Sequence, residues 1–161
     1  MDGVVGNGQG ANQQAGANVG PQLIVNAQYI KHLSFESPRS PHSLMQQAAP
    51  PSVEVNVNVT AQGLDPENYE VVLKINGSVK SQEETLFLIE LSYGAVVTAR
   101  NLTQEAIQQA VLVETPRVIF PFARNIIATT TRDGGFPPLM LNTIDFAELL
   151  RRQATEEAHT G

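Results

Sequence analysis

The chain has 161 residues, of which 10 are Lys or Arg and 16 are Asp or Glu, so its formal net charge is −6. This length suits a single domain, and an acidic chain without a basic cluster disfavours nucleic acid as a partner. The absence of Cys excludes a disulfide framework, a thiolate nucleophile and a zinc site with sulfur ligands. Charged residues make up only 16% of the chain, against about 25% in typical proteins, which favours association with another surface.

The two ends of the chain differ in composition from its middle. Residues 1–26 are rich in Gly, Asn and Gln and are expected to form a disordered tail. The first Lys is Lys31, so the chain starts without the positive region of a secretory signal, and no apolar run approaches the about 20 residues that span a bilayer. We therefore expect a cytoplasmic protein without direct membrane insertion, with one domain over 27–153 and a polar tail over 154–161.

Four segments alternate apolar and polar residues in the way that predicts β-strands. The residues predicted to share one face are Tyr29, Lys31, Leu33 and Phe35 in the first segment, Val53, Val55, Val57 and Val59 in the second, Tyr69, Val71, Leu73 and Ile75 in the third, and Phe87, Ile89, Leu91 and Tyr93 in the fourth. Most connections are short, including a predicted hairpin at Ser81-Gln82-Glu83, so the sheet should be antiparallel. Gly77 predicts either a bulge or a close approach of another segment.

Beyond residue 100 the apolar spacing becomes that of helices. The first helical set is Leu102, Ala106, Ala110 and Val113. A cap at Asn101 or Thr103 should start this helix, and Pro116 should end it. A second helix is predicted from Thr115-Pro116 to Gly134, with Pro121 either starting or kinking it. A third should begin near Asn142 or Thr143. Strands followed by helices predict an α+β fold.

The residue types that could carry catalysis or hold a metal do not form a pattern. His32, His42 and His159 lie far apart without a carboxylate at metal-ligand spacing, so they are interpreted as surface imidazoles. Glu83 and Glu84 are adjacent in the predicted hairpin and should point to opposite sides of the sheet. No Ser stands in a Gly-x-Ser-x-Gly motif. We therefore expect neither an enzyme nor a bound cofactor.

The segment Phe136–Leu141 is apolar and carries two prolines, with neither a helix nor a strand period. One interpretation is a loop packed under the last helix. The other is one wall of a groove that binds apolar chain segments.

Six short motifs between Tyr29 and about Gln153 occur in the order typical of one known family. They are Tyr29-x-Lys31-x-Leu33-Ser34-Phe35-Glu36-x-Pro38, Pro41-His42, Tyr69-Glu70-Val71-Val72-Leu73, Glu83-Glu84-Thr85, Ile119-Phe120-Pro121-Phe122-Ala123-Arg124 and Gly135-Phe136-Pro137-x-Leu139-x-Leu141. On these motifs the chain resembles SecB, the bacterial protein-export chaperone family.

The resemblance implies a four-stranded antiparallel sheet with helices packed on one face, assembled as a homotetramer that is a dimer of dimers. It also implies an ATP-independent holdase that binds unfolded preproteins, keeps them competent for translocation and delivers them to SecA without a cofactor.

By position, the resemblance implies two functional surfaces. The residues implied to line a client-binding groove are Leu44, Met45, Phe136, Leu139 and Leu141. The residues implied to bind SecA are His32, Glu36, Leu88 and Glu90. His32 stands where the family commonly carries an acidic residue.

Two other functions remain open at this stage. A SecB-like chaperone could serve a dedicated partner, such as the antitoxin of a toxin–antitoxin system, but the retained Glu36, Leu88 and Glu90 favour export. A ligand-binding module on an antiparallel sheet would need a closed pocket with converging polar groups, which no motif predicts.

Overall fold

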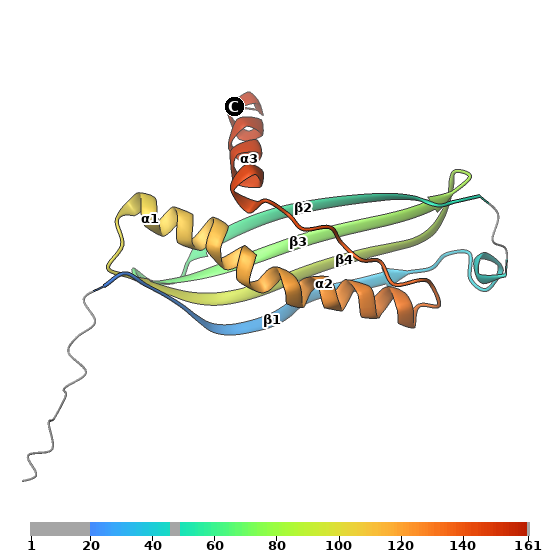
Figure 1. Ribbon diagram of the computed structural model, residues 1–161, viewed down its shortest axis with the longest axis horizontal. Helices are drawn as coiled ribbons and strands as arrows, with labels where there is room; N and C mark the ends of the chain where they lie inside the picture. The colour runs from blue at the N-terminus through green and yellow to red at the C-terminus, as the bar shows by residue number, and fades with distance from the viewer. Residues whose placement is uncertain (1–19, 46–48, 161) are drawn as a thin grey trace, which may run out of the picture.

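Four long antiparallel strands and a layer of helices form the protein in a computed structural model that describes residues 20–45 and 49–160. The strands are β1 (Gln22–Glu36), β2 (Ser52–Gly63), β3 (Asn68–Ser81) and β4 (Glu84–Arg100). They lie in the order β1-β4-β3-β2, so β1 and β2 are the edges (Figure 1). Because β1 begins at Gln22, the ordered sheet starts before the predicted boundary at residue 27, and residues 1–19 of the expected tail lie outside the described part.

The faces predicted for β1 are wrong, because this strand contains a bulge. The pairing register with β4 shifts around Lys31, so Tyr29 pairs with Gly94 while Leu33 pairs with Leu91. One extra residue in a strand reverses the alternation beyond it, and Tyr29 and Leu33 therefore point to opposite faces of the sheet. Gly94 accepts the ring of Tyr29, since a Cβ atom there would lie 2.6 Å from the ring.

Gly77 on β3 allows a close approach rather than forming a bulge. The register of β3 is regular at this residue on both sides. A Cβ atom at Gly77 would lie 3.0 Å from Ile89 Cγ2 and 3.5 Å from Leu139 Cδ2. The missing side chain therefore lets the segment after the second helix rest on the sheet.

The helical layer is one almost continuous rod instead of the two separate helices predicted. It consists of α1 (Gln104–Gln109), a π-helical segment η2 (Ala110–Glu114) and α2 (Thr115–Asp133). The prediction that Pro116 ends a helix is wrong because the wider π turn accommodates the missing proline N–H. The Thr115 hydroxyl donates a hydrogen bond of 2.9 Å to the carbonyl of Ala110 in this turn. Thr103 caps α1 as predicted, accepting the N–H of Ala106 at 3.2 Å.

The chain then crosses the sheet through residues 134–145, here called the connecting segment, and enters α3 (Phe146–Thr160) beside β2 (Figure 1). The Asp145 carboxylate accepts the N–H of Glu148 at 3.1 Å, as a residue that caps a helix start does. Helix α3 therefore begins after the predicted start at Asn142 or Thr143. It also extends through the segment from 154 that was predicted as a polar tail.

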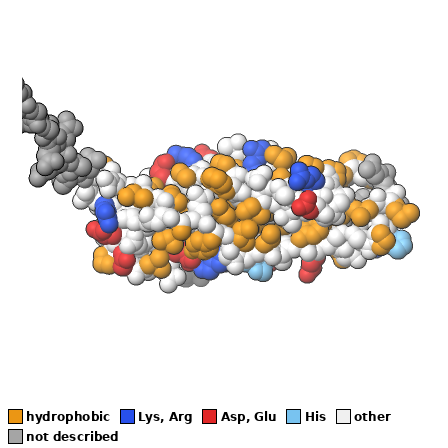
Figure 2. Space-filling model, turned by 90° about the horizontal axis from the view of Figure 1, so that it is seen from below, with side chains coloured by type: hydrophobic (Ala, Val, Ile, Leu, Met, Phe, Trp, Pro, Cys, Tyr) orange, Lys and Arg blue, Asp and Glu red, His pale blue; other side chains and the backbone are white. Residues whose placement is uncertain are grey.

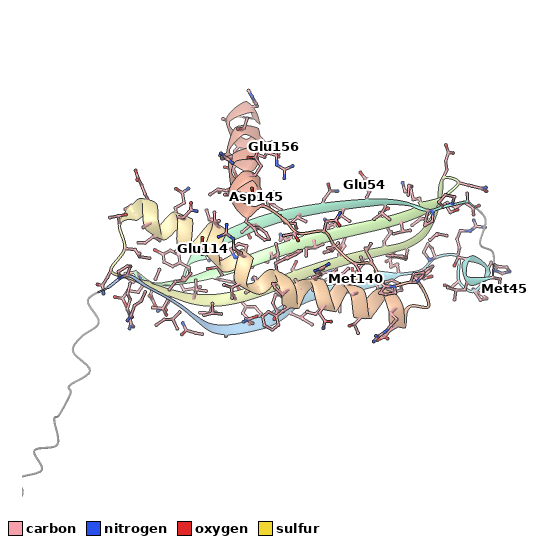
Figure 3. The ribbon with its side chains drawn as sticks, viewed as in Figure 1. Met45, Glu54, Glu114, Met140, Asp145 and Glu156 are labelled. Carbon is pink, nitrogen blue, oxygen red and sulfur yellow. The ribbon has the colours of Figure 1, made fainter. Side chains whose placement is uncertain are left out.

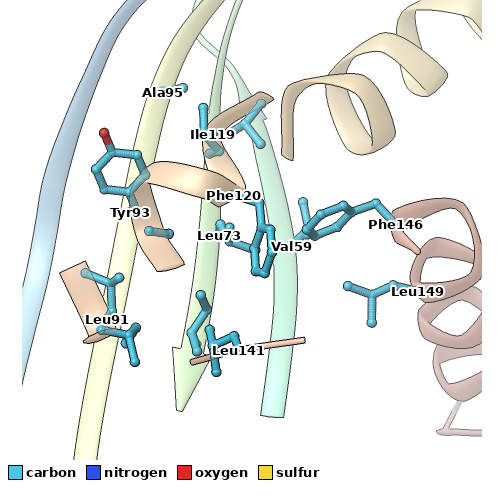
Figure 4. Close-up of a cluster of buried hydrophobic side chains, with 14 of the residues drawn as sticks. Val59, Leu73, Leu91, Tyr93, Ala95, Ile119, Phe120, Leu141, Phe146 and Leu149 are labelled. Carbon is cyan, nitrogen blue, oxygen red and sulfur yellow. The ribbon is translucent and has the colours of Figure 1, made fainter. Parts of the chain in front are cut away.

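The hydrophobic core lies between the sheet and this helical layer. Figure 4 shows its middle, where Leu73 and Leu91 of the sheet meet Ile119 of α2 and Phe146 of α3. Each such fully buried side chain contributes about 1.5–3 kcal/mol to stability. The exposed fraction on β2 rises from 6% at Val59 to 36% at Val55 and 52% at Val53, so one end of this edge strand is open.

Thr131 joins α2 to the connecting segment. Its side chain is fully buried, and its hydroxyl donates to the carbonyl of Ile127 at 2.9 Å. The same oxygen accepts the N–H of Leu139 at 2.9 Å. Sequence reasoning missed this residue, whose single hydroxyl holds Leu139 over Gly77.

We predict that Thr131→Val lowers the free energy of unfolding by about 1–3 kcal/mol, because the isosteric valine leaves the buried Leu139 N–H without an acceptor. Urea unfolding measures the loss, and amide hydrogen exchange at Leu139 should become faster. Thr131→Ser is the control because it retains the hydroxyl and should retain slow exchange. Unchanged exchange at Leu139 in the valine variant would show that this hydrogen bond does not hold the segment.

Candidate functional site

Two of the residues predicted to line an apolar groove, Leu44 and Met45, lie at the end of the molecule that carries the short 3-10 turn η1 (His42–Leu44). Leu44 and Met45 are 45% and 79% exposed, and Figure 3 shows Met45 at the tip of the molecule. Leu44 rests against Gly135, where a Cβ atom would lie 3.2 Å from both Leu44 methyl groups. The fold thus brings the connector after β1 next to the connecting segment, as the groove hypothesis requires.

Three phenylalanines form the base of this region. Phe136 lies 4.8 Å from Phe87 of β4 and 6.3 Å from Phe35 of β1 between ring centroids, and Phe35 and Phe87 are 5.6 Å apart. Aromatic pairs at such distances stabilise each other beyond the area that they bury. A Cβ atom at Gly134 would lie 2.3 Å from the Phe35 ring, so only glycine fits there. Phe136 is therefore partly buried against Phe35 and Phe87, next in sequence to the Gly135 on which Leu44 rests.

The rest of the connecting segment alternates between two sides. Leu139 is partly buried over Gly77, whereas Leu141 is 5% exposed and belongs to the core. Met140 between them is 56% exposed, and Figure 3 places it on the segment that crosses the sheet. Leu141, which the resemblance assigned to the groove, is thus covered in this structure. Val55, which pairs with Gly77, is the exposed apolar neighbour that sequence reasoning did not assign.

Sequence reasoning also missed a second depression, between α2 and the connecting segment. Its lining combines Phe120, Pro121 and Arg124 of α2 with Pro138 and Met140 of the segment. The Nε atom of Arg124 is buried there without a hydrogen-bond partner among the described residues. The uniformly apolar segment Phe136–Leu141 carries no period in the sequence that would have indicated which of its side chains face this depression.

The four residues predicted to bind SecA lie together on the sheet face that points away from the helices. Glu36 and Leu88 are direct cross-strand partners, and Leu88 is 39% exposed. The Nε2 atom of His32 lies 3.8 Å from Glu90 Oε2. Glu54 of β2 lines a shallow depression together with Leu88 and Glu90. This face presents an exposed leucine among carboxylates, here called the docking face.

A neighbouring charge cluster on the same face is neutralised internally. Lys31 Nζ lies 2.8 Å from Glu70 Oε1, and the Tyr29 hydroxyl donates to the other oxygen of this carboxylate. The hydrogen bonds from Lys31 and Tyr29 hold the pKa of Glu70 below its usual value. Burial, followed by the hydrogen bond to Glu70, raises the pKa of Tyr29 to about 12. At neutral pH, the negative charge of Glu70 therefore offsets the positive charge of Lys31. Lys31 then does not neutralise the carboxylates of Glu36 and Glu90.

Within residues 20–45 and 49–160, no group of three His, Asp or Glu side chains lies close enough to hold a metal ion. Over the same residues, the helices are too short or too polar to cross a membrane.

A structural comparison establishes the fold. The chain is similar to a SecB-like chaperone of Mycobacterium tuberculosis that was solved in complex with a ChAD peptide from the HigA1 antitoxin. The TM-score is 0.63 at 13% sequence identity, and the match covers 76% of this chain and 90% of that chain. The predicted α+β fold with a four-stranded antiparallel sheet is confirmed.

Sequence comparisons give a closer relationship. The chain is 47% identical over 152 residues to the protein-export protein SecB of Bradyrhizobium sp. strain BTAi1, covering 94% of this chain and 93% of that protein. It is 46% identical over 155 residues to the protein of the same name from Rhodopseudomonas palustris strain BisB5, covering 96% of this chain and 97% of that protein. The family model described as preprotein translocase subunit SecB matches residues 16–157. The chain therefore belongs to the SecB family.

Proposed function

We propose that this protein is an ATP-independent chaperone that binds unfolded precursor proteins in the cytoplasm, keeps them competent for translocation and delivers them to SecA. Membership of the SecB family over residues 16–157 is the observation that supports it most. The family is one of chaperones rather than enzymes. A dedicated antitoxin chaperone receives less support, because the similarity to the Mycobacterium tuberculosis protein at 13% identity concerns the fold alone.

Selection of unfolded clients follows from the apolar surface at the η1 end. A client exposes long apolar segments only before it folds, and burial of those segments against Leu44, Met45, Phe136 and Leu139 is then favourable. The unbranched side chain of Met45 adapts to client side chains of different shapes. Leu141 would support this surface from beneath instead of contacting the client. Folding of the client removes the segments and thereby releases it.

The docking face suits a partner with the opposite charge. Glu36 and Glu90 would attract basic groups of SecA, while the exposed Leu88 supplies an apolar contact between them. His32 adds no negative charge at the position where the family commonly has an acid. Because this face and the client surface lie on opposite sides of the sheet, client and SecA could be bound at the same time.

The apolar surface left on one side of the subunit supports a homotetramer that is a dimer of dimers. Figure 2 shows hydrophobic side chains gathered on the side where β1 and α2 lie. The exposed apolar residues of these two elements are Ile24, Ile30 and Leu33 of β1 and Val118 and Phe122 of α2. Strand β1 is also an open edge. We propose that β1 pairs subunits and that α2 packs the resulting dimers together.

Light scattering should therefore give a mass of about 70 kDa, four times the chain mass of 17.4 kDa. Phe122→Asp should lower this mass because it places a charge in the proposed contact between dimers. A mass of one chain at every concentration would refute the assembly.

We predict that the double variant Leu44→Asp and Met45→Asp weakens capture of a reduced, unfolded precursor about tenfold or more, because each bound segment must desolvate the new carboxylates. Fluorescence titration of the labelled precursor measures the affinity. The control is Leu64→Asp, which changes a leucine of exposure between those of Leu44 and Met45 in the turn between β2 and β3. Normal capture by the double variant, with its oligomeric mass unchanged, would exclude this surface as the client site.

The docking face is tested by Glu36→Lys combined with Glu90→Lys. The double reversal should slow association with SecA and reverse its dependence on ionic strength, since exposed charges act mainly on the encounter rate. The pair Glu83→Lys and Glu105→Lys is the control, because it makes the same charge change away from this face. Titrations with SecA and with unfolded precursor are run on both proteins. Equal losses for the two ligands, or no loss for either, would contradict a separate docking face.

A further inference from the structure

His32 lies at the border between a negative and a positive part of the sheet face that points away from the helices. Its Nε2 atom lies 3.8 Å from Glu90 Oε2, and both side chains are exposed. His32 and Lys74 are both direct cross-strand partners of Ser92, so these three residues form one row across β1, β4 and β3. The imidazole therefore has a carboxylate on the adjacent strand and an ammonium group one strand further.

The other ionisable groups near His32 leave these two charges as its relevant neighbours. The charged and titratable side chains on this part of the face are Tyr29, Lys31 and Glu36 on β1, Glu90 on β4, Glu70 and Lys74 on β3, and Glu54 on β2. Lys31 pairs with Glu70 at 2.8 Å, and Tyr29 donates a hydrogen bond to the same carboxylate. These three groups satisfy one another, whereas Glu90 and Lys74 can respond to a charge on the imidazole.

Protonation of His32 would change the charge of the docking face. Histidine is the side chain that ordinarily changes its charge between about pH 5 and 8. A neutral His32 leaves the carboxylate of Glu90 exposed near Leu88. A protonated His32 forms an ion pair with Glu90 and adds a second positive charge to the row that contains Lys74. The face then loses part of the negative potential that attracts a basic partner.

We infer that His32 makes the docking face sensitive to pH: protonation of His32 weakens docking of the basic partner, and docking releases protons from His32. The inference rests on the proposed docking of SecA at this face. A cationic group of the partner and a proton on His32 compete for the carboxylate of Glu90, so each lowers the affinity of the face for the other by the same factor. An aspartate at position 32 would not respond in this way, because it stays negative over this pH range.

The first test measures the affinity of the full chain for SecA by calorimetric titration at about pH 6 and about pH 8 and at one ionic strength. Because SecA has titratable groups of its own, the quantity compared is the ratio of the two affinities in the parent and in His32→Gln. The loss of affinity at the lower pH should be about threefold to fivefold larger in the parent, the range expected for exposed charges. Equal ratios in the two proteins would overturn the inference.

Two further variants assign the effect to the pair of His32 and Glu90. Glu90→Gln should reduce the additional loss, because the protonated imidazole then has no carboxylate to neutralise. His42→Gln removes an exposed histidine outside the docking face and should keep the ratio of the parent. An undiminished loss in Glu90→Gln, or a loss that disappears in His42→Gln, would contradict the role of this pair.

The second test measures the protons released on docking, by titration at about pH 6.5 in two buffers whose ionisation enthalpies differ. The parent and His42→Gln should release more protons than His32→Gln. Equal release by all three proteins would refute this inference and leave the docking face standing, since SecA still binds. If the parent binds SecA at neither pH, the proposed docking face itself is refuted.

Discussion

The burial of one face of the sheet beneath α2 and the connecting segment is the constraint on which the rest of this structure depends. It places Leu73, Leu91 and Ile119 in one core, and no helix of the described residues covers the opposite face. The connecting segment completes the cover because Gly77 has no side chain and Thr131 holds Leu139 in place. The cover stops short of the η1 end, which is why apolar side chains remain exposed there.

Two surfaces of different chemistry result from this one-sided cover. The proposed docking face carries exposed carboxylates on β1 and β4, where position is set by cross-strand pairing and long-range attraction would assist encounter. The surface proposed to bind clients carries flexible apolar side chains on short connectors, which would suit ligands of varied sequence. Lys31 pairs with Glu70 on the same face of the sheet. This lysine therefore does not offset the negative charges of Glu36 and Glu90.

The two edge strands of the sheet, β1 and β2, differ in the residues that lie beside them. Open edges invite pairing with other chains, and a protein must cover, block or use them. The β1 edge lies beside exposed apolar residues of both β1 and α2, a combination suited to contact between subunits. The β2 edge is closed at Val59 by an amide side chain and is free before it. The proposed pairing of subunits through β1 would leave the β2 edge before Val59 outside that contact.

The sequence by itself determined the four strands, the hairpin between β3 and β4, a helix cap at Asn101 or Thr103 and the common face of Glu36, Leu88 and Glu90, because alternation and capping are properties of neighbouring residues. Only the tertiary structure decided the bulge at Lys31, the burial of Leu141 and the union of α1 and α2 through a π turn. It also decided the contacts of Thr131 with Leu139 and of Gln153 with Val59. These features depend on which distant segments meet and on how closely they pack, and a single extra residue or hydroxyl leaves no mark on the hydrophobic period that sequence reasoning reads.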